Sequence, residues 1–261
     1  MNQPAKKAIL AVSFGTSYEE TRKVTIDAIE HDLSAAFPDH TLYRAWTSKM
    51  ILSKLKKRDN LHICNVCEAM EQMMADKVTE VIVQPTHVIN GIENDLMQKD
   101  ALSYEEHFHK ISFGAPLLTS QQDNEDTIRA VMERWKNLPK NEVLVLMGHG
   151  TTHYANAVYA ALDYTLKDMG YDQVFLGTVE AYPSLETLLR KIKDVHPTKV
   201  HLAPFMIVAG DHARNDMAGD DPKSWRYQFE HAGFHVECHL TGLGEYEGIR
   251  RIFVEHAKES C

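Results

Sequence analysis

The stretch AILAVSFGTS, residues 8–17, returns in altered form as VLVLMGHGTT at residues 143–152. Each copy is an apolar run that ends in Gly-Thr, which is typical of a buried strand giving way to a turn. A second pair, QPTHVINGIEND at residues 84–95 and APFMIVAGDHARND at residues 203–216, matches in the same way. The sequence therefore predicts two copies of one α/β unit.

The rest of the chain alternates between strand-like and helix-like patterns. Apolar runs typical of strands cover residues 8–14, 41–46, 79–84, 110–114, 142–147, 173–180, 199–205 and 234–240. Helical periodicity covers residues 17–37, 48–57, 65–76, 121–136, 152–168, 184–195, 222–232 and 246–258. This alternation predicts an α/β protein with two similar doubly wound parallel-sheet domains and a cleft between them.

The domain boundary is expected after the helix that ends near residue 136. That choice gives an N-terminal domain over residues 1–136 and a C-terminal domain over residues 137–261, joined at Asn137-Leu138-Pro139. The last helix, 246–258, is free to pack back on the N-terminal domain.

Composition excludes several classes of protein. With 44% hydrophobic and 25% charged residues, the chain reads as an ordinary soluble globular protein. A net charge of −9 argues against nucleic acid as a partner. The apolar runs are strand-sized, so no membrane span is expected, and AILAV after MNQPAKK is too short for a signal-peptide core. We expect a cytoplasmic protein.

The cysteines are sparse. Cys64 and Cys67 form one C-x-x-C motif with His62 nearby, and Cys238 and Cys261 stand alone. A structural zinc site usually has a second pair of ligands, so these cysteines are interpreted as structural or incidental, in a reducing compartment.

Four polar residues follow predicted strands, where ligands of open parallel sheets bind. His149, Glu180 and His212 belong to the second copy, and Glu93 belongs to the first, where it aligns with His212. Phe14 of the first copy aligns with His149. Taken singly, each polar residue is also compatible with a tight turn, a helix cap or a surface position. Together, two imidazoles and a carboxylate suit cobalt, nickel, iron or zinc, or a proton-transfer site.

Four segments resemble a known family: LAVSFGTSYEET, MGHGTTHYANAVYAALD, VEAYPSLETLL and HLAPFMIVAGDHARNDMAGDDPKSW. They are similar to the anaerobic sirohydrochlorin cobaltochelatases, the CbiK family of class II chelatases, over residues 6–256. The resemblance implies a lyase that inserts Co²⁺ into sirohydrochlorin, or its precorrin-2 form, in cobalamin biosynthesis, without ATP. It implies that His149, Glu180 and His212 bind the metal and that His149 also accepts a pyrrole proton. Glu93 is a second acid/base candidate. The C-x-x-C segment lies outside the family pattern, and no haem is expected.

A tetrapyrrole substrate carries carboxylates, which the acidic chain must meet with local donors or cations. The turns at 15–17 and 150–152 are expected to open helix N-termini that receive carboxylates, and the segment 43–58 supplies Arg44, Lys49 and Lys54. The rings of Phe14 and Tyr18 are compatible with a position against the macrocycle, although core packing is the default interpretation for Phe14. The predicted substrate-binding residues are Phe14, Thr16, Ser17, Tyr18, Gly150 and Thr151.

Two other functions fit the same residues. One is a chelatase for nickel or ferrous iron, because the ligand set does not separate these metals from cobalt. The other is a metal- or tetrapyrrole-binding protein without turnover. A homo-oligomer is compatible with either.

Overall fold

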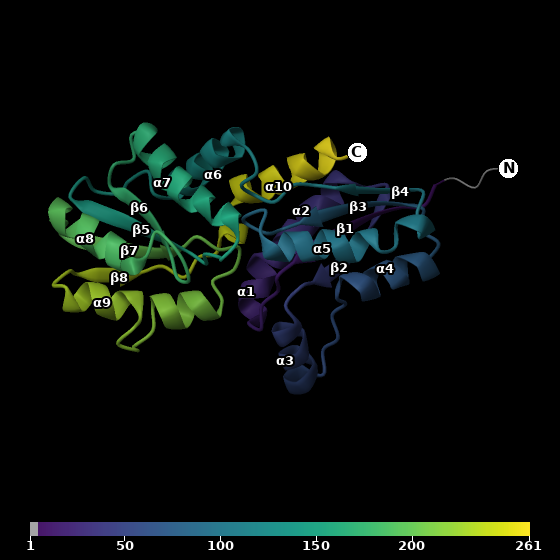
Figure 1. Ribbon diagram of the computed structural model, residues 1–261, viewed down its shortest axis with the longest axis horizontal. Coiled ribbons are helices and arrows are strands. Elements are labelled where there is room, and N and C mark those ends of the chain that lie inside the picture. Colours follow the sequence, from purple (N-terminus) through teal and green to yellow (C-terminus); the bar gives the residue numbers. More distant parts are fainter. Residues whose placement is uncertain (1–4) are drawn as a thin grey trace. The chain divides into compact units, whose positions relative to one another are not determined.

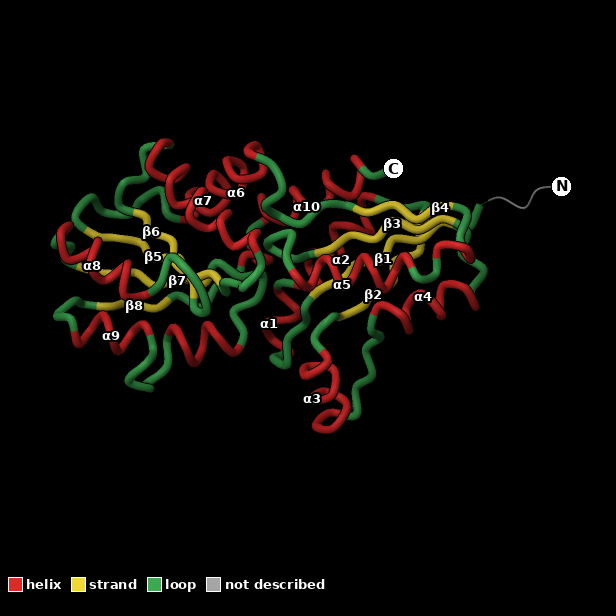
Figure 2. Tube along the Cα trace, in the orientation of Figure 1, coloured by secondary structure: helices red, strands yellow, loops and turns green. Residues whose placement is uncertain are grey.

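The computed structural model describes residues 5–261, so residues 1–4 of the N-terminal segment MNQPAKK lie outside it. The described chain divides into two compact units, the first formed by residues 5–119 with 247–261 and the second by residues 120–246. Each unit is a parallel four-stranded sheet with helices on both faces (Figures 1 and 2). The prediction of two doubly wound parallel sheets is confirmed.

The first unit has the strand order β2-β1-β3-β4. Helices α4 and α5 cover one face, where they enclose the apolar core, and α2 and α10 cover the other. Its elements are β1 (Lys7–Ser13), α1 (Glu19–Val24), α2 (Ile26–Ala36), β2 (His40–Trp46), α3 (Lys49–Asp59), α4 (Val66–Ala75), β3 (Glu80–Pro85), α5 (Ile92–Leu102), η1 (Glu105–His107), β4 (Lys110–Phe113) and α10 (Glu247–Glu259).

The second unit repeats this order as β6-β5-β7-β8. Helices α8 and α9 enclose its core on one face, and α6 and α7 lie on the other. Its elements are α6 (Gln121–Arg134), β5 (Glu142–Gly148), η2 (Tyr154–Asn156), α7 (Ala157–Asp168), β6 (Val174–Thr178), α8 (Leu185–Val195), β7 (Lys199–Pro204), η3 (Ala213–Met217), α9 (Trp225–His231), β8 (Val236–Cys238) and η4 (Leu243–Glu245).

The sequence repeat is a structural repeat down to the strand register. Val12 on β1 is the partner of Pro85 on β3, and Met147 on β5 is the partner of Pro204 on β7. The glycines two residues after the two matched strands both have positive φ, +98° at Gly15 and +86° at Gly150. At Gly150 a Cβ would lie 2.9 Å from Cβ of Thr178, so only glycine fits this turn.

The units exchange their last helices. Helix α6 follows β4 of the first unit but packs on α7 of the second, and α10 follows β8 of the second unit but packs on α2 and β3 of the first. The contact boundary therefore falls at Thr119/Ser120, whereas the sequence analysis placed it after residue 136.

Two helical segments differ from the sequence-based expectation. The expected helix 17–37 is interrupted at Thr25, whose φ and ψ of −121° and −79° are not helical and whose hydroxyl donates to the Thr21 carbonyl. Helix α5 was not predicted, because its buried face includes Asn94 beside Met97 and Ala101 and so lacks a clear apolar period. Within residues 5–261, no helix is both long and apolar enough to cross a membrane.

Candidate functional site

His149 lies directly after β5, at the carboxyl end of the second sheet. The backbone stays paired beyond the strands, because Val179 N donates to Gly148 O and Glu180 N donates to His149 O, both at 3.0 Å. Glu180 is thus two residues past β6, rather than at its end as the sequence suggested. This pairing brings the Glu180 carboxylate to 3.9 Å from Nδ1 of His149.

His212 reaches the same place from the segment after β7. It is the N-cap of the π-helical turn η3, not part of a loop. Its Nε2 lies 3.1 Å from Nε2 of His149, and the two rings meet edge to face. One potential ligand atom from each of His149, Glu180 and His212 lies within 4.8 Å of the others. The structure therefore brings together the three residues predicted to bind metal.

The hydrogen bonds of the far ring nitrogens indicate which tautomers are present. Nδ1 of His149 is 2.8 Å from the Gly150 carbonyl oxygen, and Nδ1 of His212 is 2.6 Å from the Asp216 carboxylate. Both acceptors place the proton on Nδ1, which leaves a lone pair on each Nε2. Two lone pairs that face each other at 3.1 Å repel unless a cation or a proton lies between them. The three side chains are 36–54% exposed, so an ion placed among them would remain open to exchange.

Sequence reasoning missed two residues that position this site. Asp216 lies four residues after His212 on the same turn, and its contact is typical of the carboxylates that orient metal-binding histidines. Asn156 accepts from Thr151 N at 3.1 Å and donates to the Tyr182 carbonyl at 2.7 Å, so it joins the loops after β5 and β6. The i, i+4 spacing of His212 and Asp216 was a signal available in the sequence.

The other predicted residues of the second unit lie beside the trio. Gly150 is buried, and the Thr151 hydroxyl accepts from His153 N. Because Thr151 N–H is already bonded to Asn156, the turn offers fewer free donors than expected. The helix expected from residue 152 begins at Ala157, after the short turn η2.

The remaining predicted residues belong to the first unit. Phe14 is 44% exposed after β1, while Thr16 and Ser17 are buried. Tyr18 caps the short helix α1, whose first turn already carries Glu19 and Glu20, so this N-terminus is poorly suited to a carboxylate. Glu93 lies in the first turn of α5, not in a loop.

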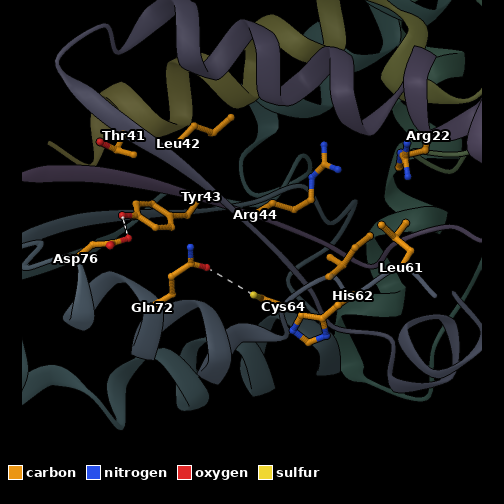
Figure 3. A pocket seen from close by; sticks show the side chains of 11 residues that line it. Arg22, Thr41, Leu42, Tyr43, Arg44, Leu61, His62, Cys64, Gln72 and Asp76 are labelled. Atoms are coloured by element: carbon orange, nitrogen blue, oxygen red, sulfur yellow. Dashed lines mark hydrogen bonds between the residues drawn. The ribbon is translucent and has the colours of Figure 1, made fainter. Parts of the chain in front are cut away.

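A hollow of about 560 Å³ in the first unit lies beside β2 (Figure 3). Its wall includes Arg44, which the sequence offered as a partner for substrate carboxylates. The Arg44 guanidinium forms ion pairs with Asp27 and the buried Glu30. This cation is therefore neutralised inside the unit, and Lys49 and Lys54 of α3 remain exposed.

The C-x-x-C segment borders the same hollow. His62, Cys64 and Glu68 lie close enough together to share an ion, but Cys67 is not part of the group. Burial raises the pKa of the Cys64 thiol, and the Glu68 charge adds to the shift. The Glu68 carboxylate also accepts from Asn65 N at the start of α4. A thiol that stays protonated is a poor ligand, so the trio of the second unit is the better site.

His87 is a buried residue that the sequence analysis did not weigh, two positions after β3. Burial lowers its pKa to about 4, with Asn94 opposing the shift. An unfolded histidine takes a proton near pH ~6.5. In the folded chain, His87 takes up that proton only near pH 4, because its pKa is lowered to about 4. Stability is therefore unaffected above pH ~6.5 and is lost as the pH falls below it.

We expect His87→Leu to remove this acid sensitivity. Between pH 7.5 and 5.0 the native chain should lose about 2 kcal/mol more in free energy of unfolding than the variant, as measured by urea denaturation. The exposed His196, replaced by Gln, serves as control and should keep the native pH dependence. An equal loss in His87→Leu and the native chain would contradict the assignment.

Comparisons with known proteins identify the family of this chain. The family model described as "Cobalt chelatase (CbiK)" matches residues 7–261. A sirohydrochlorin cobaltochelatase of Salmonella typhimurium is 40% identical over 255 residues, covering 98% of this chain and 96% of that protein. The sirohydrochlorin cobaltochelatase CbiKC of Nitratidesulfovibrio vulgaris is 32% identical over 258 residues, covering 96% and 89%.

A solved structure shares the fold at low sequence identity. SirB from Bacillus subtilis, solved with Fe³⁺, has a TM-score of 0.69 at 15% identity and covers 98% of this chain and 95% of its own. That likeness supports the fold, whereas the family match and the two relatives extend over almost the whole sequence. The chain belongs to the cobalt chelatase (CbiK) family.

Proposed function

We propose that this protein inserts Co²⁺ into sirohydrochlorin, or into its precorrin-2 form, during cobalamin biosynthesis. Two relatives named sirohydrochlorin cobaltochelatase, 40% and 32% identical, support the substrate and the metal. The observation that carries the chemistry is the pair of Nε2 atoms of His149 and His212, 3.1 Å apart, whose other nitrogens face acceptors. We expect a cytoplasmic enzyme that works without ATP.

The substrate metal would be held by His149, Glu180 and His212. Two neutral imidazoles and one carboxylate suit a divalent metal of borderline softness. Because these side chains are partly exposed, the nitrogens of the tetrapyrrole can replace them one at a time. Asp216 keeps His212 in the tautomer that ligates and holds the ring in place as the metal leaves.

Insertion also releases two protons from the ring nitrogens. Once the metal has moved to the macrocycle, Nε2 of His149 is free to accept one of them, and general-base help of this kind contributes ~10²–10⁴-fold to a rate. Glu93, half-buried in the first turn of α5, is the second acid/base candidate.

Contacts with the macrocycle are assigned to side chains and backbone near the strand ends. Phe14 and Tyr18 in the first unit, and the exposed Tyr154 and Tyr182 in the second, offer aromatic surface. We keep Thr16, Ser17, Gly150 and Thr151 as the expected contacts of the substrate carboxylates. Because the acidic first turn of α1 and the bond from Thr151 to Asn156 limit these groups, the exposed Lys49 and Lys54 of α3 are the stronger candidates.

Anaerobic assay with sirohydrochlorin and Co²⁺ tests the proposal. An absorbance change that continues over many turnovers supports an enzyme, while a change that stops at one equivalent indicates a binder without turnover. Ni²⁺ and Fe²⁺, assayed in parallel, decide between cobalt and the alternative metals.

We expect His212→Ala and Glu180→Ala each to weaken Co²⁺ binding by at least about tenfold, because each removes a ligand. Titration followed by the ligand-field absorption of Co²⁺ measures this. His235→Ala and Glu186→Ala are matched controls on the same unit. An unchanged Co²⁺ affinity in either ligand variant would remove that residue from the site.

A further inference from the structure

A second histidine–carboxylate cluster lies on the sheet of the second unit, away from the strand ends where His149 lies. Val143 on β5, Val200 and Leu202 on β7, and Cys238 on β8 face the core under α8 and α9. Residues between them point to the opposite face, because side chains alternate along a strand. Glu142, His201, Glu237 and His239 therefore share that face, and His201 and Glu237 are direct cross-strand partners.

The ligand atoms of this cluster converge. Nδ1 of His201 is 3.0 Å from Nε2 of His239. The Glu237 carboxylate is 3.9 Å from the first of these nitrogens and 3.7 Å from the second. Two nitrogens on one tetrahedral Zn²⁺ lie ~3.3 Å apart, given bonds of about 2.0 Å, so closure around an ion needs movements of only a few tenths of an ångström.

Glu142 orients the buried member of the pair. Its carboxylate lies 2.6 Å from Nε2 of His201, which places the proton there and leaves a lone pair on Nδ1 toward His239. The same arrangement occurs in the first site, where Asp216 lies 2.6 Å from His212. A carboxylate behind the ring is the usual support of a metal-binding histidine.

The surroundings shield the cluster partly from water, because His201 is buried and His239 is half-buried. The ring of Trp135, directly after α6, lies edge-on to both histidines, with centroid distances of 5.4 Å to His201 and 4.8 Å to His239. Lys199 now pairs with Glu237 at 3.0 Å and would have to release one carboxylate oxygen.

We propose that His201 Nδ1, His239 Nε2 and the Glu237 carboxylate form a second divalent metal site, with Glu142 as positioning residue. The ligand set suits Zn²⁺, Co²⁺ or Ni²⁺. A bound ion would replace the hydrogen bond between the two histidines and tie the edge strand β8 to β7. Because this site shares no residue with the trio around His149, its occupancy does not depend on the proposed chelatase activity.

The first test measures the zinc bound by a chain that lacks the two histidines His149 and His212. The variant His149→Ala/His212→Ala, dialysed against micromolar Zn²⁺ and analysed by elemental mass spectrometry, should retain one Zn²⁺ per chain. Adding His239→Gln should lower this to none, and adding His235→Gln, an exposed neighbour on the same approach to β8, should leave it at one. No retained zinc, or zinc that survives His239→Gln, overturns the proposal.

The fluorescence of Trp135 provides a second measurement, which reports where the ion binds. Co²⁺ added to the same background variant should quench tryptophan fluorescence in a saturable way, because the ion would lie next to the indole. Trp135→Phe should remove most of that quenching although Trp46 and Trp225 remain. Zn²⁺ at 100 times its dissociation constant should also raise the melting temperature of the background variant by roughly 5–10 °C. Quenching that persists in Trp135→Phe, or a melting temperature indifferent to Zn²⁺, counts against the site.

Discussion

His149→Ala should lower the rate of cobalt insertion by at least ~10²-fold, and by up to ~10⁴-fold if His149 is the principal proton acceptor. The substitution removes a proposed ligand and a proposed base together, because the Nε2 atom that faces His212 would serve in both roles. The His149 side chain is 44% exposed, so its truncation opens no buried cavity. Anaerobic initial rates with sirohydrochlorin and Co²⁺ measure the effect.

Two controls separate a lost function from a lost fold. The variant should keep the melting temperature of the native chain, since no core residue changes. The second control is the variant His153→Ala. It changes a histidine of the same loop that is not among the three predicted ligands. Near-native turnover in His149→Ala, at full substrate saturation, would show that metal transfer proceeds without this residue.

Phe253→Ala should destabilise the first unit by about 3–5 kcal/mol. Phe253 is fully buried on α10, the helix that covers α2 and β3. The ion pair from Arg250 to Asp32 at 2.7 Å does not compensate, because partly exposed pairs contribute about 0–1 kcal/mol. Urea unfolding should therefore show an early transition confined to the first unit.

Limited proteolysis locates that transition. Cleavage of Phe253→Ala should fall within residues 5–119, whereas the matched core variant Phe229→Ala, on α9 of the second unit, should direct cleavage to residues 120–246. If both variants were cut in the same unit, α10 would not be an integral part of the first unit's core.

The strands could be read from the sequence because parallel strands buried on both faces are continuous apolar runs. All eight strands of residues 5–261 fall where such runs occur. Helix α5 could not be read, since it buries Asn94 among apolar residues. The break at Thr25 was equally hidden, because both α1 and α2 keep a helical pattern through it. Nor does periodicity say which sheet a helix will cover. The sequence analysis grouped the helix 121–136 with the first domain, whereas the contacts of α6 group it with the second unit.

The proximity of His149, Glu180 and His212 was also predictable, because a parallel sheet gathers its strand ends at one edge. Side-chain contacts that depend on the folded geometry could not be predicted from the sequence. In the sequence, Arg44 is a candidate to bind a substrate carboxylate. In the structure its guanidinium forms ion pairs with Asp27 and Glu30 of α2, the helix that precedes it in the chain. His201 and His239 are 38 residues apart and meet only through the register of β7 with β8.

The exchanged helices bear on the order in which the newly made chain can fold on the ribosome. All of residues 120–246 leave the ribosome before α10 does. The second unit can therefore reach its complete structure while the first, although synthesised earlier, still lacks the helix that covers α2 and β3. Domains generally fold in the order in which they are made. In this chain the N-terminal unit is completed after the second unit has been synthesised, and until α10 emerges the face of α2 and β3 that it covers stays open to solvent.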